Sequence, residues 1–566
     1  MKTGAGRKGQ GVRFRNDTVL SSYISLELPR NLAIMFHPKK NQRHRRYYPT
    51  LLERIRAARR TLQLQHWSVM QSAVSPTCFL IEPTIAKSML ATHELRHFYS
   101  DEEDSDNASD CNSGNNSDMK HYDHDDDKME KGYADLHKPT KATKLLHHAL
   151  TNANGRTWRR QRHCVSRAFA VDKATRNVYA NVYAVGSAME VMNNLFGNDD
   201  NSRRTMNPIT KWSRRHRRNN TIDIRYFAKE VAIQTLYKIV FGTSTKQPSI
   251  IINFLHDMVL DTLELRRDEE YSNMSASIVD RLDEAVRNEI EDIISSTTGR
   301  MDNVKDTPCL VERLLQYSNS DGEYYLTKDE IVGNAHSALL AGIQTISTTL
   351  AGAMLHLAER PQLQAELRKN DKVGTSPPLI SGKDVVNETL RILPPVAGLP
   401  RVPTGCGVEI SSSSSPCPMS SSIQKGQLVI IDLVAFAHAK KEVAVSTDKE
   451  DSDEKYQPTS FITLQFNPMN KRRGEAAPWG IGRRSCPAGI ISVECISAII
   501  EGIAMCGVTY SIEKDNDRCL RQKKKDSNNQ GWFKVISYRP TLSYLKPVNI
   551  RFGKHNESID KVKSKQ

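Results

Sequence analysis

The stretch APWGIGRRSCPAG, residues 477–489, decides how this chain is interpreted. It places Cys486 behind two glycines and two arginines and ahead of a proline and the apolar run GIISVECISAII. A cysteine that is buried only for packing needs neither basic neighbours nor a glycine-rich approach. Arginines and a helix N-terminus stabilise a thiolate, and glycines let the backbone pass close to a large flat partner. The stretch therefore predicts that Cys486 is a ligand.

The composition is that of a large and basic folded chain. Its 566 residues carry 80 Lys+Arg against 65 Asp+Glu, a net charge of +15. This charge suits acidic partners and is equally typical of a soluble enzyme with basic tails. The ten cysteines include no C-x-x-C pair, which argues against a zinc ribbon or a thioredoxin-like site. Their scatter fits a reducing compartment better than a disulfide scaffold.

The N-terminal region contains no apolar run that reads as a membrane span. Its best candidate, which starts at Val19, is interrupted by Glu27, Pro29 and Arg30 and falls short of the roughly 20 apolar residues needed. The basic start of the chain resembles an organelle transit peptide, and a disordered basic tail fits equally well. We expect an intracellular protein, either peripheral on the endoplasmic reticulum or inside a mitochondrion or plastid.

Three polar or charged segments are expected to be disordered insertions, because such runs cannot bury enough apolar surface to fold. They cover residues 100–133, 406–424 and 440–457. The expected organisation is a basic targeting or peripheral region over 1–70, one catalytic domain over 71–553 that contains the insertions, and a basic tail over 554–566.

The rest of the chain reads as mostly helical. Apolar spacing and terminal residues predict helices over 151–169, 223–242 and 275–296. Thr327 and Glu330 form a capping box for a longer apolar helix that runs unbroken to Pro361. Gly342 in its middle has two explanations, either a close helix crossing or a local opening where a ligand meets the helix. Residues 427–439 read as a strand and a turn.

Four short motifs occur along the chain, and their order is informative. They are W-x-x-x-R at 158–162, A-G-x-x-T at 341–345, E-x-x-R at 388–391 and W-x-x-G-x-R-x-C at 479–486. Alone, a Glu–Arg pair at this spacing is weak evidence. In this order the four motifs resemble the cytochrome P450 family, and the resemblance runs from about residue 70 to residue 553. A chance run of glycine and arginine around a core cysteine does not explain the order.

The resemblance implies a mainly α fold with small β-sheets and a long central helix over a haem. It implies heme b as the cofactor, with Cys486 as the axial ligand of the iron, a thiolate that favours O–O cleavage. The residues implied to contact the haem or its propionates are Trp158, Arg162, Arg401, Arg484, Gly480 and Gly482. Glu388 and Arg391 are implied to be a structural pair that locks the loop leading to the cysteine.

The long helix carries the positions implied to be catalytic: Ala341, Gly342, Gln344 and Thr345. The hydroxyl of Thr345 is implied to help deliver protons to bound oxygen. Substrate contacts are implied at four small or apolar residues, Ala338, Val396, Ala397 and Leu399, so we expect an apolar or amphipathic organic substrate.

The chain departs from the family pattern at four points. Gln344 stands where an acid is usual, so proton delivery needs water or another acid. Ala488 replaces a glycine, which is a mild change if the backbone needs no positive φ there. Asn470 occupies an arginine position, so either Arg472 or Arg473 substitutes or the Glu–Arg pair lacks its third member. The N-terminal membrane anchor of eukaryotic members is not visible.

The function that the resemblance implies is a monooxygenase of secondary metabolism that inserts one atom of O₂ into its substrate. The chain has no flavin, Rossmann or iron–sulfur signature, so the electrons come from an NADPH-dependent flavoprotein reductase or a ferredoxin. The basic residues expected at that docking face are Lys471, Arg472, Arg473, Arg483, Arg484, Arg159 and Arg160. The alternative is that these residues serve only the propionates and solubility. No nucleic acid is expected as a partner, and peripheral membrane contact is compatible.

Two other functions stay open. One is a haem-thiolate isomerase or dehydratase that does not use O₂; Thr345 argues against it and Gln344 mildly for it. The other is a non-catalytic haem-binding relative, against which the intact Cys486, E-x-x-R motif and Thr345 argue.

Overall fold

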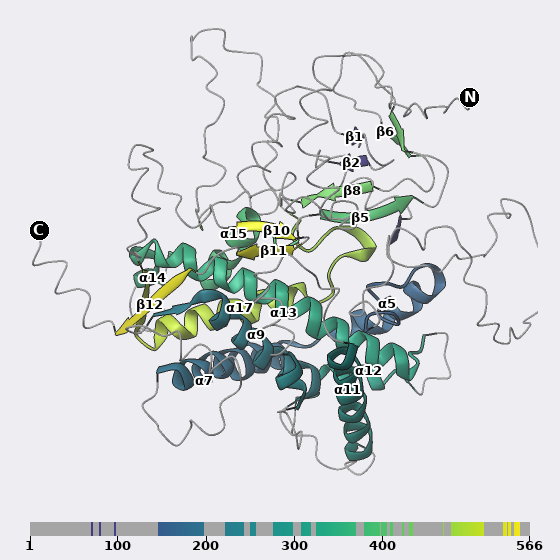
Figure 1. Cartoon of the computed structure of the whole chain (residues 1–566), viewed down its shortest axis with the longest axis horizontal. Coiled ribbons are helices and arrows are strands. Elements are labelled where there is room, and N and C mark those ends of the chain that lie inside the picture. The colour runs from purple at the N-terminus through teal and green to yellow at the C-terminus, as the bar shows by residue number, and fades with distance from the viewer. Residues whose placement is uncertain are drawn as a thin grey trace, which may run out of the picture.

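The computed structural model describes the parts of the chain that position the site. These are residues 69–71, 78–80, 95–97, 145–196, 221–242, 250–255, 276–297, 307–318, 324–368, 379–396, 398–403, 408–410, 421–423, 429–433, 468, 477–513, 536–539, 541–544 and 548–554. Helices dominate, and a small sheet lies at one edge of the helical body (Figure 1). The expected class, mainly α with small β-sheets, is confirmed.

The main helices follow the order of the chain. They are α5 (Gly155–Phe169), α6 (Lys173–Asn177), the π-helical η2 (Val178–Ala184), α7 (Val185–Phe196), α9 (Ile224–Phe241), α11 (Ala276–Thr297), α12 (Leu310–Leu315), α13 (Lys328–Ala358), α14 (Pro361–Arg368), α15 (Gly382–Ile392), the 3-10 turn η8 (Gly482–Arg484) and α17 (Gly489–Met505). The capping box predicted for the longest helix is present, because Thr327 accepts from the Glu330 N–H and Glu330 accepts from the Thr327 N–H. The other three helix predictions are confirmed by α5, α9 and α11.

The strands form four small sheets. The strands are β1 (Val69–Gln71), β2 (Cys78–Leu80), β3 (Leu95–His97), β4 (Thr221–Asp223), β5 (Gly398–Pro403), β6 (Val408–Ile410), β7 (Ser421–Ile423), β8 (Val429–Asp432), β9 (Val508–Ile512), β10 (Ile536–Arg539), β11 (Thr541–Tyr544) and β12 (Asn549–Lys554). The largest sheet has the order β1-β2-β8-β5-β3, with β2 and β8 parallel and the other pairs antiparallel. The strand predicted within 427–439 is β8.

One expected insertion differs from the prediction. The 406–424 segment was expected to be disordered, yet β6 and β7 lie within it and pair antiparallel, with Val408 opposite Ile423. The prediction of disorder is therefore wrong at the two flanks of the segment, because Val408–Ile410 and Ser421–Ile423 form paired strands. The insertions at 100–133 and 440–457 lie outside the described residues.

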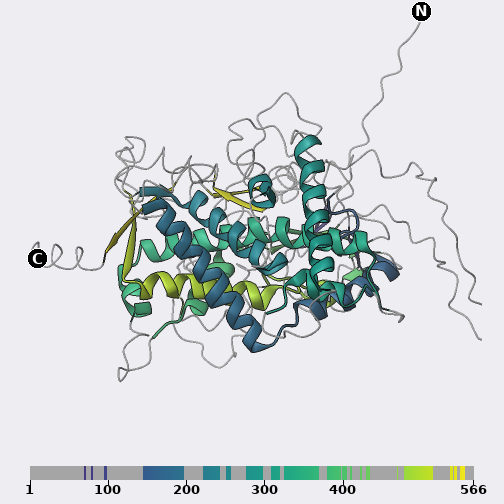
Figure 2. The same cartoon turned by 90° about the horizontal axis from the view of Figure 1, so that it is seen from below.

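Helix α13 runs through the centre of the molecule and packs against α9. Leu339, Ile343 and the residues from Ile346 onward are buried along it. Among the described helices, α13 is long and apolar enough to cross a membrane. However, 67% of its most apolar 18-residue segment is buried inside the protein, as in the core helix of a folded domain. Helix α17 runs alongside α13 in both views (Figures 1 and 2).

The crossing of α9 and α13 explains Gly342. A Cβ at this position would lie 2.8 Å from Leu236 Cδ1 of α9, so any larger residue would require the Leu236 side chain to shift. The helix continues without a break through Gly342. Of the two explanations offered by the sequence, the close crossing is confirmed and the local opening of the helix is wrong.

Candidate functional site

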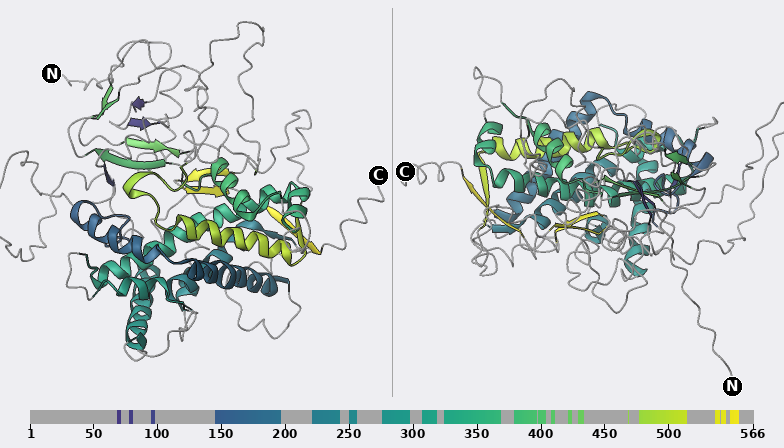
Figure 3. Two further views of the ribbon diagram at one scale, coloured as in Figure 1. Left: turned by 180° about the vertical axis from the view of Figure 1, so that it is seen from behind. Right: turned by 90° about the horizontal axis from the view of Figure 1, so that it is seen from above.

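The loop that carries Cys486 is shaped by its glycines. Gly480 and Gly482 have φ values of +72° and +74°, a region that side chains with a Cβ rarely adopt. The Cys486 N–H donates to the Trp479 carbonyl at 2.8 Å, which closes the loop just before α17 begins. The loop passes beside β5 (Figures 1 and 3), where Leu399 Cδ1 lies 3.7 Å from the Cβ position of Gly480.

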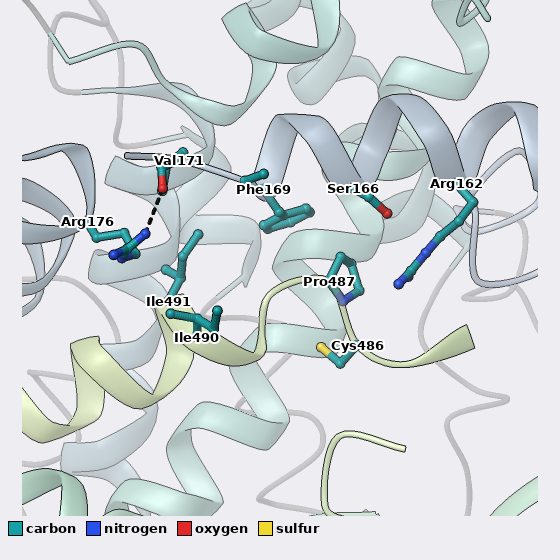
Figure 4. Close-up of a pocket in the computed structure, with 10 residues that line it drawn as sticks. Arg162, Ser166, Phe169, Val171, Arg176, Cys486, Pro487, Ile490 and Ile491 are labelled. Atoms are coloured by element: carbon teal, nitrogen blue, oxygen red, sulfur yellow. Dashed lines mark hydrogen bonds between the residues drawn. The ribbon is translucent and has the colours of Figure 1, made fainter. Parts of the chain in front are cut away.

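The cysteine side chain is presented to a hollow of about 290 Å³ between α5 and the start of α17. Figure 4 shows Arg162 and Phe169 of α5 directed toward the loop of Cys486. Enclosure by the surrounding protein raises the pKa of the Cys486 thiol, although the residue is exposed to the hollow. The Ala488 N–H and the positive charge of Arg162 oppose that rise. Both favour the thiolate, as expected for a ligand cysteine.

Ala488 confirms one conditional prediction. It is the N-cap of α17 with φ −90°, so the backbone at this position needs no positive φ. Alanine is therefore accommodated without strain where the family usually has glycine.

Arginines from three distant parts of the chain gather around this loop. Arg162 Nη1 donates to the Ser485 carbonyl at 2.7 Å. Arg484 donates to Asn154 Oδ1 at 2.8 Å and to the Ala153 carbonyl at 3.2 Å. Both arginines thus donate to neutral acceptors.

The third arginine, Arg401, is buried on β5. Burial lowers the pKa of Arg401 to about 10. Burial first, and then the charges of Arg401 and Arg162, lower the pKa of Arg484 to about 9. Three cations that lie close enough to repel one another are suited to an anionic ligand, which would relieve that repulsion.

Helix α13 leaves part of one face open in its middle. Ala341 is exposed, and Ala338 and Thr345, which lie on the same face, are half-buried, whereas the helix is buried from Ile346 onward. Thr345 Oγ1 donates to the Ala341 carbonyl at 2.8 Å. An open stripe on an otherwise buried helix indicates a surface that a bound group covers.

Gln344 faces a different partner, one that sequence reasoning missed. Lys229 Nζ of α9 donates to Gln344 Oε1 at 2.6 Å, and Gln344 Nε2 donates to the Leu542 carbonyl of β11 at 3.0 Å. The available signal was a lysine in the middle of the apolar run of α9. Nothing in the sequence pointed to β11.

Glu388 and Arg391 form a bidentate ion pair within α15, with both contacts at 2.8 Å. Glu388 is completely buried. Helix α15 packs on α17, and the Gly382 N–H donates to Glu501 Oε1 of that helix at 2.6 Å. The proposed third members, Arg472 and Arg473, lie outside the described residues.

The expected substrate contacts are only partly placed. Val396 and Leu399 are half-buried, and Ala397 lies outside the described residues. The turn at Pro395 is tied to the β10–β11 hairpin, because the Leu542 N–H donates to the Pro395 carbonyl at 2.8 Å.

The expected basic docking face is only partly described. Arg160 pairs bidentately with Glu330 at the start of α13, one contact being 2.8 Å, and 19% of its side chain is exposed, so much of its charge is already neutralised. Arg484 is half-buried and donates to Asn154 Oδ1. Arg159 and Arg483 are exposed, and residues 471–473 lie outside the described part. Sequence spacing shows which residues share a helix but not which face is buried.

Comparisons with known proteins bear on this geometry. The family model described as cytochrome P450 matches residues 115–489. Cytochrome P450 monooxygenase claQ of Ampulloclitocybe clavipes is 24% identical over 58% of this chain and 64% of its own length. The human mitochondrial 25-hydroxyvitamin D-1 alpha hydroxylase is 36% identical over 28% of this chain and 30% of its own. The chain thus spans less than two thirds of these relatives.

Solved structures agree on the fold. The crystal structure of a cytochrome P450, CYP102L1, matches with a TM-score of 0.55 and 14% identity over 89% of this chain and 99% of that chain. The retinoic acid-bound cyanobacterial CYP120A1 matches with a TM-score of 0.54 and 13% identity over 88% of this chain and 93% of that one. At these identities the likeness shows the fold alone.

Proposed function

Because this chain belongs to the cytochrome P450 family, we propose that it is a haem-thiolate monooxygenase that inserts one oxygen atom of O₂ into an apolar or amphipathic organic substrate. The observation that carries the proposal is the ring of Arg162, Arg401 and Arg484 around the loop of Cys486. A site that brings three arginines together, with Arg401 buried among them, favours an anionic ligand, and a cofactor with two carboxylates supplies that negative charge.

The residues of this site fit a haem. Cys486 would ligate the haem iron, and Trp158, Arg162, Arg401 and Arg484 would hold the propionates. The positive φ values of Gly480 and Gly482 keep side chains off the loop where a flat ring would lie. When bound, the haem supplies the centre that activates O₂ and its thiolate ligand favours O–O cleavage.

The protein's own contribution to proton delivery would come from Thr345. Its hydroxyl hydrogen is engaged by the Ala341 carbonyl at 2.8 Å, while its lone pairs remain able to accept a hydrogen bond. Rotation of the hydroxyl would release that hydrogen toward the open face of α13, where Ala341 leaves room.

Glu388 and Arg391 would act as a structural pair. Their buried bidentate contact lies within α15, and α15 packs on the helix that follows the cysteine. We therefore assign them the support of the Cys486 loop rather than contact with substrate.

The substrate would lie between α13 and the turn that follows α15. Ala338, Val396 and Leu399 are small or apolar and half-buried, and Ala397 completes the set by its place in the chain. Such a lining favours apolar or amphipathic molecules. Secondary metabolism would be the setting.

An acidic flavoprotein reductase or ferredoxin would supply electrons at the hollow beside Cys486. Ile490 is 66% exposed there, next to Phe169, and Arg483 and Arg159 lie exposed on the neighbouring elements. An apolar patch with basic residues around it is complementary to an acidic partner. Haem reduction by such a donor should slow as salt rises, and a rate that ignores salt would contradict docking by charge.

For the organisation of the chain we keep a catalytic domain over 71–553 with a basic tail after it. Strand β1 begins at Val69, just before that boundary. The compartment would be organellar or the surface of the endoplasmic reticulum.

The experiment that tests the proposal is turnover of the haem-loaded chain with and without O₂. Substrate candidates are first found in a metabolite screen by the shift that they cause in the haem spectrum. Product that contains one atom from labelled O₂ supports the monooxygenase. Product formed equally without O₂ and reductant would instead support the isomerase or dehydratase, which the neutral Gln344 mildly favours.

A further inference from the structure

Lys229 is a cation enclosed near the centre of the molecule. It lies on α9 with only 7% of its surface exposed. Burial, and secondarily the charge of Arg225 one turn earlier, lowers the pKa of Lys229 to about 8. Arg225 itself is paired with Asp223 at 2.7 Å. Burying an ammonium group in such a place costs folding free energy, which its hydrogen bonds offset only in part.

The described partner of Lys229 is a neutral amide rather than a carboxylate. Nζ donates to Gln344 Oε1 at 2.6 Å, and within the described part of the chain no acidic residue is paired with this lysine. A hydrogen bond from an ammonium is roughly twice as strong as a neutral one.

The amide of Gln344 is fixed at both ends. Because lysine can only donate and a carbonyl can only accept, the amide oxygen must face Lys229 and the nitrogen must face the Leu542 carbonyl. Leu542 then donates its own N–H to the Pro395 carbonyl at 2.8 Å. One chain of hydrogen bonds thus joins α9, α13, β11 and the turn after α15.

We infer that Lys229 is a positioning residue for the proposed oxygenation, because through the Gln344 amide it holds the β10–β11 hairpin and the Pro395 turn against the middle of α13. The inference rests on the proposed function, which places the substrate beside Ala338 of α13 and Val396 of the Pro395 turn. Thr345, the residue proposed for proton delivery, follows Gln344 directly in the chain. Lysine and glutamine are chemically matched here. A carboxylate at 344 would accept from Lys229 but could not donate to Leu542.

The test compares three variants of the full chain, Lys229→Met, Lys229→Arg and Lys238→Met. Lys238 is the matched control, because it lies on the same helix but binds Ser187 and Glu190 near the surface. The first readout is amide hydrogen exchange over 536–544, which needs no activity. The second is the ratio of the affinities of the haem-loaded protein for 4-phenylimidazole and for imidazole, whose common azole binds iron while the phenyl ring meets the surrounding walls.

Lys229→Met should speed exchange at 536–544 at least fivefold and weaken 4-phenylimidazole at least fivefold relative to imidazole. Lys229→Arg should restore part of both, and Lys238→Met should change neither. Unchanged exchange at the hairpin, or faster exchange spread evenly over the chain, would overturn the inference. If Lys229→Met does not fold, Gln344→Leu removes the same bridge from the other side and must give the same hairpin result. A wild-type chain that binds no haem contradicts the proposed function while leaving the exchange result readable.

Discussion

Arg484 stacks on Trp158, with its guanidinium carbon 4.5 Å from the centre of the ring. The same guanidinium donates to Asn154 Oδ1 at 2.8 Å, one residue before α5 begins. The arginine of the cysteine motif and the tryptophan of the first motif therefore form one unit, although they are far apart in the chain. Asn154 holds the arginine in place beside Trp158.

The Arg484 unit predicts a haem-affinity effect. Arg484→Ala removes a cation and the stack on Trp158, so we expect haem to be lost at least tenfold more readily, which transfer of haem to apomyoglobin measures. Arg483→Ala is the matched control, since Arg483 is exposed. Equal haem loss from both variants would contradict the role of Arg484.

Thr345 predicts a coupling effect. Thr345→Ala removes the hydroxyl that bonds to the Ala341 carbonyl, so reducing equivalents should be diverted into peroxide several-fold more than in the wild type. Peroxide formed per reduced cofactor consumed is the measurement. Thr345→Ser keeps the hydroxyl and should keep the coupling; if Thr345→Ala couples as well as the wild type, the hydroxyl is only a packing group.

The hydrogen bond between Lys229 and Gln344 predicts that Lys229 controls the ionisation of a carboxyl group placed at position 344. In Gln344→Glu the new carboxylate pairs with Lys229, which holds its pKa low, so it carries no proton. Peroxide formation should therefore stay within about twofold of that of Gln344→Leu, which loses the same tie to Leu542. In the double variant Lys229→Met with Gln344→Glu, burial without a cation raises the pKa of the carboxyl, and peroxide should fall below that of Lys229→Met. Less peroxide from Gln344→Glu than from Gln344→Leu would show that Lys229 does not control ionisation there.

Lys229 also predicts a pH-dependent stability. Its pKa is about 8 in the folded chain against 10.5 ordinarily, so between these values the unfolded state binds more protons and the unfolding free energy of the wild type rises with pH. Lys229→Met lacks this rise. Relative to wild type it should gain on the order of 3 kcal/mol below pH 8, and the gain should shrink as pH approaches 10.5.

Urea unfolding at several pH values measures this difference, and its slope with pH is the quantity to compare. Lys238→Met serves as the control, because this lysine is part-exposed and paired with Glu190. A difference between wild type and Lys229→Met that stays constant from pH 7 to 10 would mean that the pKa of Lys229 is not lowered. General damage to the fold would lower its stability. If Lys229→Met is more stable overall and yet exchanges faster at the β10–β11 hairpin, the faster exchange therefore comes from the lost local tie.

Local chemistry explains what could be predicted from sequence. The capping box at Thr327, the glycines around Cys486 and the helix end at Gly242 depend on neighbouring residues, and the structure has them as expected. The order of four motifs was enough to indicate the fold.

The features that could not be predicted from the sequence depend on how helices and strands far apart in the chain pack against one another. Arg160 shares a basic helix with Arg159, yet it faces Glu330 because of how α5 meets α13. The contact between Lys229 and Gln344 arises from the crossing of α9 and α13, which the sequence indicated only through Gly342. The tie from Gln344 to Leu542 requires a hairpin that no motif marked.

The central claim is that Cys486 holds a haem as a thiolate, and the reduced, CO-treated spectrum tests it most directly. The wild type and Cys506→Ala, a matched exposed cysteine at the far end of α17, should both show the thiolate-type Soret band. Cys486→Ala should lose that band while far-ultraviolet circular dichroism stays close to wild type. A thiolate-type band that persists in Cys486→Ala, or that is absent from wild-type protein supplied with haem, would contradict the account.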